Sequence, residues 1–553
     1  MTTMWNLSPI SNSSPARDFS PIPRRGVNVA EFLVQTASRL PSHPAVIDDR
    51  SNTTWTWQEL REKVQFAAEV LKSKGVQRRD TVMLLSTNTA HMIQYFWGII
   101  WAGGVVAPPN AKMSYREIED LTRRTVPRVI VAHPDFRETV ERLVDNKLVT
   151  TVIWLGDGSD DGAQQKTDEE LTPSAPEGVM GDDPMWYFFT SGSTGAPKMA
   201  VFTHAHAGSV LMNHYCDLFP TEDHNGRSLI IAPLSHGAGI HMLAQVFTGA
   251  ASVIYPGDSL DGELAWECID KYRITNAFTV PTILNKIARA YPESRGPDDH
   301  SMKYVIYAGA PMLAHDQQHA LNRLGKCLVQ YFGLGEVTGS ITALRPEEHG
   351  VIPEDASGIG TCGRPRTSIQ ISIQSDDGDR LAPYEHGEVC VAGPTVCAGY
   401  LNDDKANAEA FKDGWFHTGD IGYVDEHGYL FLTGRKSDMY ISGGSNVYPR
   451  EIEELLTAHP SVSNSAVIGI PDEKWGEKGV AVIETDRVGD LDELEHELRA
   501  YLKANLAAYK VPKVFKPTVQ LPLTAYGKVA RKELKQALTE DIDIDVATVQ
   551  VGK

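Results

Sequence analysis

The sequence is poor in cysteine and in positive charge, and each shortage excludes a class of protein. Its 553 residues contain six cysteines and no C-x-x-C pair, so we expect reduced, buried thiols and a cytoplasmic protein rather than a disulfide framework. The spacings His204/His206 and His214/Cys216 lack a second pair to complete a zinc site, and we expect them to be incidental. Basic residues number 52 against 72 acidic ones, for a formal charge of −20. That balance argues against nucleic-acid binding and against a polybasic membrane patch.

The sequence also lacks a convincing membrane span. Residues 81–111 carry no Asp, Glu, Lys or Arg, but polar residues and Gly and Pro pairs divide them into short pieces. We expect a strand at 81–86, a helix at 89–102 and a strand at 105–107, which together form a βαβ unit. Residues 1–27 are rich in Ser and Pro and lack an apolar core segment, so we expect a flexible lead-in rather than a secretory signal.

At this length the chain exceeds a single core and should form at least two domains. Strands and helices alternate through residues 28–436, which predicts an α/β domain of doubly wound parallel sheets. Within it, residues 358–432 have short strands and frequent Gly, which predicts a β-rich subdomain. Residues 437–553 are expected to form a small, mobile α+β lid domain, and residues 157–183, acidic and rich in Gly, Ser and Pro, an exposed connection.

The most informative stretch is Tyr187–His204, YFFTSGSTGAPKMAVFTH. Its two apolar runs flank residues rich in hydroxyl groups and glycine, which predicts a strand, a tight loop and a return strand. Backbone N–H groups and hydroxyls in such a loop can converge on an anion, and Lys198 adds a positive charge at the loop exit. The pattern therefore predicts a polyphosphate ligand, although Pro197 before Lys198 and the lack of a following Ser or Thr exclude a Walker A loop.

This loop resembles the phosphate-binding loop of the adenylate-forming enzymes, which include acyl-CoA synthetases, adenylation domains of peptide synthetases and firefly luciferase. Five further segments resemble motifs of that family in the family's order: YAGAP (307–311), YFGLGE (331–336), GWFHTGD (414–420), GRKSD (434–438) and LPLTAYGKVARKEL (521–534). Ligands of doubly wound sheets bind beyond the carboxyl ends of strands, where we place 233–239, 307–311 and 331–339.

The resemblance implies a set of site residues and the cofactors ATP, Mg²⁺ and coenzyme A. Catalytic roles fall to Lys528, Glu336 and His236, metal binding to Glu336 and Thr194, and a hinge role to Ser437. For ATP and AMP the residues are Thr190, Ser191, Gly192, Ser193, Thr194, Gly195, Lys198, Gly309, Ala310, Pro311, Tyr331, Phe332, Gly333, Asp420, Arg435 and Lys528. For the acyl pocket they are His236, Gly237, Ala238, Gly239, Gly335, Val337 and Ile341. For coenzyme A they are Ser442, Gly443, Gly444, Trp475, Tyr509 and Lys513.

These assignments imply an ATP-dependent ligase that first forms an acyl-adenylate and pyrophosphate, then acyl-CoA and AMP. The pocket segments 235–242 and 333–341 contain no Arg or Lys, which favours an aryl or medium-chain fatty acid over a dicarboxylic acid. Two alternatives stay open: an enzyme that loads a carrier protein, and a non-catalytic nucleotide-binding relative. Luciferase-like oxygenation also uses such a site. Only residues 529–553 follow Lys528, so we expect no carrier domain there.

Two positions depart from the family pattern. The family's usual Tyr-Gly-x-Thr-Glu is Phe332-Gly333-Leu334-Gly335-Glu336 here, so a hydroxyl expected beside the phosphate is missing. The hinge position, commonly Lys or Asp in the family, is Ser437. Individually, His236 could be a structural histidine and Lys513 a solvated lysine. The sequence leaves the oligomeric state open, a homodimer included.

Overall fold

The computed structural model describes residues 26–156, 173–190, 197–257, 259–310, 312, 314–351, 360–442, 445–472, 475–487, 491–523 and 529–540. The predictions for the lead-in and for Ser191–Gly195, Pro311, Gly443, Gly444 and Lys528 lie outside these residues.

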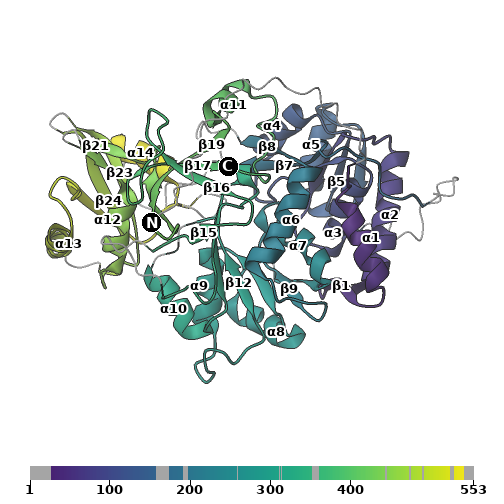
Figure 1. The fold of residues 1–553 in the computed structure, drawn as a ribbon, viewed down its shortest axis with the longest axis horizontal. Coiled ribbons are helices and arrows are strands. Elements are labelled where there is room, and N and C mark those ends of the chain that lie inside the picture. Colours follow the sequence, from purple (N-terminus) through teal and green to yellow (C-terminus); the bar gives the residue numbers. More distant parts are fainter. Residues whose placement is uncertain are drawn as a thin grey trace, which may run out of the picture.

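Two largely parallel sheets form the larger part of the molecule (Figure 1). The six-stranded sheet has the order β6-β5-β3-β4-β7-β8, and only the β7–β8 pair is antiparallel. Its strands are β3 (Thr81–Leu85), β4 (Val105–Ala107), β5 (Val129–Ala132), β6 (Val152–Trp154), β7 (Pro184–Thr190) and β8 (Lys198–Thr203).

The nine-stranded sheet has the order β15-β14-β13-β12-β11-β9-β10-β1-β2, parallel from β13 to β1 and antiparallel at both ends. Its strands are β1 (Pro44–Asp48), β2 (Thr53–Thr56), β9 (Arg227–Ile230), β10 (Ala251–Ile254), β11 (Asn276–Thr279), β12 (Tyr304–Tyr307), β13 (Leu328–Phe332), β14 (Thr342–Leu344) and β15 (Arg364–Pro365). The prediction of doubly wound parallel sheets is confirmed.

Three helices lie between the two sheets and share one apolar core with both: α3 (Ala90–Trp101), α6 (His204–Leu218) and α7 (Gly237–Thr248). Burial on all sides explains why α3 reads as a continuous apolar run. Helix α3 connects the parallel strands β3 and β4 and completes the βαβ unit predicted from residues 81–107. Among the described residues no helix is long and apolar enough to cross a membrane.

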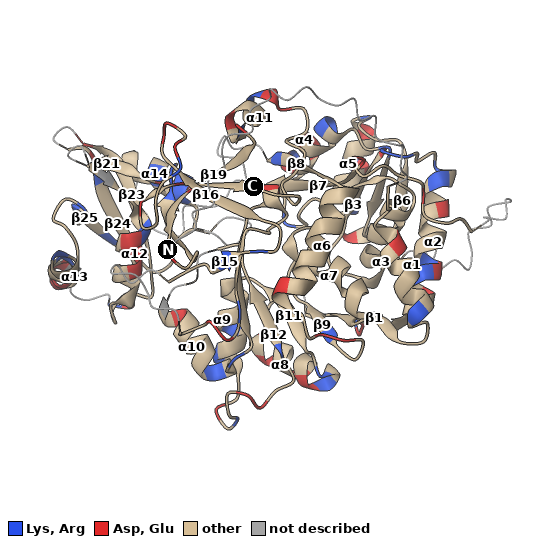
Figure 2. Ribbon diagram, in the orientation of Figure 1, with Lys and Arg blue, Asp and Glu red and all other residues tan. Residues whose placement is uncertain are grey.

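The remaining helices of this part cover the outer faces of the sheets or the flank of the core. They are α1 (Ala30–Arg39), α2 (Trp57–Ser73), α4 (Tyr115–Thr125), α5 (Arg137–Asp145), α8 (Gly262–Tyr272), α9 (Pro281–Ala290) and α10 (Ala314–Leu324), with short 3₁₀ turns η1 (Pro134–Phe136) and η2 (Gly335–Val337). Local sequence sets where several begin. Thr56 and Ser114 form capping boxes with Glu59 and Glu117 at the starts of α2 and α4. Charged residues are frequent on these outer helices and on loops (Figure 2).

A five-stranded antiparallel sheet follows, in the region expected to be β-rich. It comprises β16 (Gln370–Gln374), β17 (Gly387–Ala392), β18 (Phe411–Lys412), β19 (Trp415–Val424) and β20 (Leu430–Arg435), with helix α11 (Asp404–Ala410) beside β18. The C-terminal part has a mixed sheet of β21 (Tyr440–Ser442), β22 (Ser445–Val447), β23 (Asn464–Asp472), β24 (Gly476–Glu484) and β25 (Val514–Thr518), with α12 (Pro449–Ala458), α13 (Leu491–Asn505) and α14 (Arg531–Thr539). The boundary after residue 436 stays a prediction.

Three local predictions were wrong. Residues 173–183 are not uniformly exposed, because Asp183 is fully buried and its carboxylate accepts hydrogen bonds from Arg78 and Arg79. The segment 233–239 is not all loop, since Gly237–Gly239 form the first turn of α7. The cysteines are free, as predicted, but Cys216 is exposed rather than buried, because it lies on the outer side of α6.

Candidate active site

The topology brings most of the predicted site segments to one edge. Strands β9, β11, β12 and β13 are parallel neighbours, so the residues that follow each strand emerge on the same side. The β7–β8 hairpin of the other sheet reaches this edge, where β7 contacts η2, the turn that carries Glu336. The phosphate-binding loop predicted between β7 and β8 therefore begins and ends beside Glu336.

Glu336 is held by hydroxyl groups from two other segments. The Thr190 hydroxyl, at the end of β7, donates to Glu336 Oε1 at 3.0 Å, and the Tyr400 hydroxyl donates to the same oxygen at 2.9 Å. Lys198, at the start of β8, lies over the Tyr400 ring with Nζ 4.8 Å from the ring centroid. The sheet pairing places Thr190 opposite Lys198, so both sides of the hairpin contact this cluster.

This arrangement suits a magnesium ion that also binds phosphate. Glu336 is 8 % exposed, and both described hydrogen bonds use Oε1, so Oε2 remains available as a ligand atom. Among the described residues no group of three or more His, Cys, Asp or Glu could hold a metal. A single carboxylate is nonetheless typical of Mg²⁺, which is often bound by one or two carboxylates together with substrate phosphates and water.

Tyr400 was not predicted from the sequence. Burial and the adjacent Glu336 carboxylate raise the pKa of its phenol, which therefore stays protonated and donates. It follows Gly399, whose φ of +118° marks an unusual backbone position. A glycine before an aromatic residue was the only local signal, and it does not indicate a contact with a residue 64 positions away.

Asp420 and Arg435 form a cross-strand pair between β19 and β20. They face each other in the register, and Arg435 Nε donates to Asp420 Oδ1 at 3.0 Å. The Asp420 carboxylate raises the pKa of Arg435. Two residues predicted to bind the nucleotide are thus brought together, with Asp420 buried and the Arg435 side chain half-exposed.

His236 lies at the start of α7, next to the strand that leads to the phosphate loop. Its Nδ1 is 2.9 Å from the Ser235 hydroxyl, and its ring packs edge-on against Phe188 at 5.7 Å. Phe188 also faces Gly335, because a Cβ built on Gly335 would lie 2.9 Å from Phe188 Cδ1. His236 and Gly335, both predicted acyl-pocket residues, therefore lie beside the same aromatic ring.

The predicted acyl-pocket residues divide into two groups. A Cβ built on Gly237 would lie 2.6 Å from Phe278 Cζ and 3.0 Å from the Tyr331 hydroxyl, so these two aromatic side chains border Gly237. Ala238 and Gly239 are buried in the first turn of α7. In contrast, Val337 and Ile341 are fully buried in the apolar cluster of the β-rich sheet.

Two of the segments predicted to bind ATP and AMP lie at the ends of β12 and β13. Gly309 has a φ of +83° and Ala310 follows it after β12. Gly333 is required by close packing, because a Cβ there would lie 2.0 Å from the Gly339 carbonyl oxygen. Tyr331 and Phe332 alternate on β13, and Tyr331 is the more deeply buried.

Three of the predicted coenzyme A residues come together in the C-terminal sheet. Ser442 on β21 pairs with Gly476, directly after Trp475. Lys513 Nζ lies 4.8 Å from the centroid of the Trp475 ring. Tyr509 is exposed. A half-buried lysine stacked on a tryptophan is a suitable contact for a phosphate or an adenine ring.

The predicted hinge residue lies in a hydrogen-bonded turn. The backbone N–H groups of Asp438 and Met439 both donate to the Arg435 carbonyl at 3.1 Å. Ser437 is exposed in this turn, and its hydroxyl donates to Asp438 Oδ1 at 3.0 Å.

A buried cation near the acyl region was also missed. Arg366 is fully buried, its Nη2 donates to Asn213 Oδ1 at 2.7 Å, and its Nε lies 3.5 Å from Asp217 Oδ2. Its guanidinium carbon is 5.7 Å from the Tyr331 ring centroid. Arg366 lies outside segments 235–242 and 333–341, from which the acid was predicted. Only the tertiary structure places it beside Tyr331.

Comparison with known proteins agrees with this geometry. The family described as AMP-binding enzyme matches residues 33–401, and its C-terminal domain matches residues 451–528. The chain is similar to a feruloyl-CoA synthase of Amycolatopsis sp (32 % identity; 93 % of this chain and 99 % of the relative) and to a long-chain-fatty-acid–CoA ligase of Mycobacterium tuberculosis (30 %; 92 % and 98 %). It is also similar to the structure of o-succinylbenzoate CoA synthetase from Bacillus subtilis in complex with an acyl-adenylate intermediate (28 %; 93 % and 99 %; TM-score 0.79).

The chain therefore belongs to the AMP-binding enzyme family, whose members form adenylates. Within that class it is an AMP-forming acid–thiol ligase of the acyl-CoA synthetase type, which binds ATP.

Proposed function

We propose that this enzyme activates an aryl or medium-chain fatty acid with ATP and Mg²⁺ and transfers it to coenzyme A. The observation that carries the proposal is the Glu336 cluster. A buried carboxylate is held there by Thr190 and Tyr400, with Lys198 over the Tyr400 ring, where the loop between β7 and β8 begins and ends.

In the first half-reaction the carboxylate oxygen of the acid bonds to the α-phosphorus of ATP and pyrophosphate leaves. Glu336 would hold the magnesium ion, together with Thr194, and when bound that ion offsets negative charge on the phosphates. Lys198 and the loop donors would bind the pyrophosphate oxygens, Asp420 the ribose hydroxyls, and Arg435 the ribose or phosphate. Lys528 would orient the attacking carboxylate. The acid is already ionised, so no general base is needed.

In the second half-reaction the thiol of coenzyme A attacks the acyl carbon and AMP leaves. Trp475, Lys513 and Ser442 would contact coenzyme A, since they lie together in the C-terminal sheet. His236, beside Phe188, would border the path between the thiol and the acyl-adenylate. The substrates, and the free thiols of the described cysteines, suit a cytoplasmic enzyme.

The similar proteins support an aryl or fatty acid as the substrate. They also include an enzyme with a different acyl acceptor, a carrier protein in place of coenzyme A. They include an indoleacetate–CoA ligase of Aromatoleum aromaticum at 32 % identity and, at 29 %, a fatty acid–[acyl-carrier-protein] ligase of Streptomyces coeruleorubidus. We favour coenzyme A because Lys513 stacked on Trp475 offers a cation and an aromatic face, as its phosphates and adenine require.

A screen of carboxylic acids for pyrophosphate release, run with and without coenzyme A, tests the proposal. Wild-type enzyme should release pyrophosphate with aryl or medium-chain acids and make a thioester only with coenzyme A. Lys528→Ala should lose adenylation by at least ~10²-fold yet form thioester from supplied acyl-adenylate. Equal loss of both half-reactions would refute the role of Lys528. Thioester formation only on a carrier protein would refute the role of coenzyme A.

A further inference from the structure

Tyr331 directs its hydroxyl into the region assigned to the acid. It lies on β13 and is 7 % exposed. A Cβ built on Gly237 would lie 3.0 Å from the Tyr331 hydroxyl, and one built on Gly339 would lie 2.9 Å from it. The Tyr331 hydroxyl therefore lies in the space that side chains at Gly237 and Gly339 would otherwise fill. This side chain thus points toward the segments assigned to the acid.

The Tyr331 hydroxyl makes no hydrogen bond to any residue that the structure describes, although other buried tyrosines of the same sheet do. Tyr304 contacts Thr221, and Tyr307 contacts His349 and Gln330. The Tyr331 residue is buried, but its hydroxyl oxygen is not among the fully enclosed unpaired polar atoms. A ligand can therefore reach this oxygen, and a ligand group that cannot accept its hydrogen bond would leave it unpaired. Burial also raises the pKa of Tyr331, and the phenol is therefore a neutral donor at neutral pH.

The surroundings of this hydroxyl are aromatic. The Phe278 ring lies 5.6 Å from the Tyr331 ring, and the Phe278 edge faces Gly237. The His214 ring lies 6.3 Å away on another side. Flat rings opposite a glycine form a wall suited to another flat ring rather than to a branched or bulky aliphatic chain.

The charges near Tyr331 are balanced inside the protein. Arg366, the buried cation beside the ring, is paired with Asp217 and Asn213. The histidines behind the ring are neutral, because burial lowers the pKa of His241 to about 4 and lowers that of His214 as well. The Asp217 carboxylate already offsets the charge of Arg366, although Arg366 Nη1 has no hydrogen-bond partner among the described residues. A neutral oxygen on the acid would find the Tyr331 donor.

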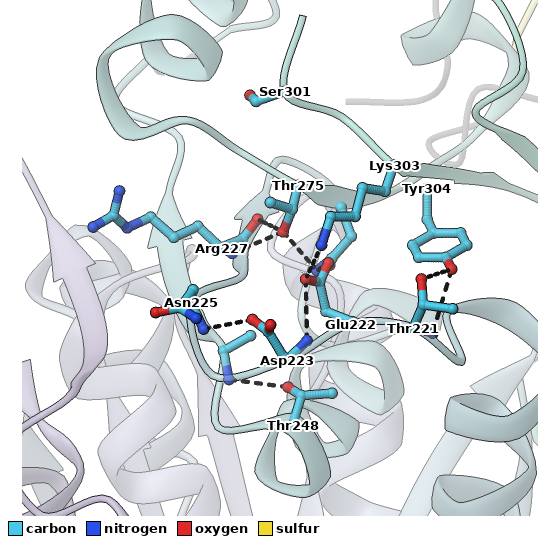
Figure 3. A network of polar contacts seen from close by, with 12 residues as sticks. Thr221, Glu222, Asp223, Asn225, Arg227, Thr248, Thr275, Ser301, Lys303 and Tyr304 are labelled. Atoms are coloured by element: carbon cyan, nitrogen blue, oxygen red, sulfur yellow. Dashed lines mark hydrogen bonds and ion pairs between the residues drawn. The ribbon is translucent and has the colours of Figure 1, made fainter.

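A chain of polar contacts fixes the orientation of these histidines, and it begins at Glu222 and Lys303 (Figure 3). Lys303 lies 3.6 Å from the fully buried Glu222 carboxylate, which accepts a hydrogen bond from Asn276 Nδ2 at 2.9 Å. Asn276 Oδ1 must then accept from His241 Nε2, at 2.8 Å, and His241 Nδ1 accepts from His214 Nε2 at 3.0 Å. Both imidazoles are held as fixed tautomers, so the wall behind Tyr331 is preorganised.

From these contacts we propose that Tyr331 determines specificity by donating a hydrogen bond to an oxygen substituent at the end of an aryl acid remote from its carboxylate. The acid class is thereby narrowed to aryl carboxylic acids with a neutral hydroxyl or alkoxy group. The inference rests on the proposed adenylation of carboxylic acids.

Isosteric pairs of acids test it directly. Pyrophosphate release is measured with 4-methoxy and 4-ethyl derivatives of benzoic, phenylacetic and cinnamic acid, which differ only by O in place of CH₂. Wild-type enzyme should favour the methoxy member of the best pair by at least ~10-fold in kcat/KM, because the ethyl group leaves the Tyr331 hydroxyl unpaired. Tyr331→Phe keeps the ring and should abolish this preference while retaining turnover of the ethyl acid.

Tyr304→Phe is the matched control, since it removes a buried tyrosine hydroxyl of the same sheet that is bonded to Thr221 (Figure 3). Its methoxy-to-ethyl ratio should equal that of the wild type. A wild-type preference for ethyl acids, or an unchanged ratio in Tyr331→Phe, would overturn the inference while leaving adenylation intact. Should Tyr331→Phe fail to fold, the wild-type ratio still decides. The absence of pyrophosphate release with every acid would overturn the proposed function, and this inference with it.

Discussion

The γ-methyl group of Thr190 occupies the space in which a side chain at residue 335 would begin. A Cβ built on Gly335 would lie 2.3 Å from Thr190 Cγ2, and Phe188 closes the other side. The glycine in place of the family's usual threonine is therefore matched to its neighbours, and the hydroxyl beside Glu336 comes from Thr190 instead.

This contact changes what we expect of substitutions at Gly335. From the sequence, Gly335→Thr should alter acid preference or rate without abolishing activity. The structure predicts that Gly335→Ala already costs about 1–3 kcal/mol of stability by overpacking. Thr190→Ser keeps the hydroxyl and removes the methyl group, so the double variant should recover part of that loss. Thermal unfolding and ATP–pyrophosphate exchange measure both. Simple additivity of the two substitutions would show that they do not share this space.

Glu336→Gln should lower magnesium-dependent adenylation by ~10²-fold or more, because it removes the charge that would bind the ion. Tyr400→Phe should cost about tenfold, since it removes one hydrogen bond to that carboxylate. Magnesium titrations of ATP–pyrophosphate exchange measure both effects.

Glu348→Gln is the control for Glu336. Glu348 also accepts a hydrogen bond from a tyrosine, Tyr429, and pairs with Arg364. Among the described residues, none of its hydrogen bonds or ion pairs involves Thr190, Lys198 or Glu336. Its magnesium dependence should match that of the wild type. An unchanged magnesium dependence in Glu336→Gln would mean that the metal binds elsewhere.

Ser437→Pro should keep ATP–pyrophosphate exchange near normal but lose thioester formation. Lys528 and the coenzyme A residues all lie beyond the proposed boundary, so one domain must present each to the same site in turn. Proline fixes φ at 437 and restricts Lys436. The exposed turn around Ser437 leaves room for the proline ring. Ser437→Ala serves as the control, and acyl-CoA formation by Ser437→Pro at the wild-type rate would place the hinge elsewhere.

Stability should fall as the pH is lowered from about 6.5 towards 4, partly because of His241. Burial lowers its folded-state pKa from 6.5 to about 4, so in this window the unfolded chain binds a proton that the folded chain does not. The stabilisation is fully present above pH 6.5 and lost as the pH falls, by up to ~3 kcal/mol for this group. His241→Gln should flatten the pH dependence of the unfolding free energy, whereas the exposed His496→Gln should not. Equal slopes for His241→Gln and wild type would contradict this.

Much of the architecture followed from the sequence by itself. The βαβ unit at residues 81–107, the β7–β8 hairpin around the phosphate loop and the alternation of strands and helices depend on local periodicity and on Gly and Pro, which act over a few residues. Motif order pointed to Asp420 and Arg435, and the antiparallel register of β19 and β20 pairs them. The order of the motifs also pointed to the family and to its adenylating chemistry.

Only the tertiary structure decided which side chains complete the site. Tyr400 reaches Glu336 across 64 residues, and Arg366 reaches Asn213 across 153. The burial of Asp183 by Arg78 and the overlap of Thr190 with the space beside Gly335 likewise join segments far apart in the chain. Such contacts depend on how two twisted sheets pack around shared helices, because that packing sets distances between residues that no local pattern relates.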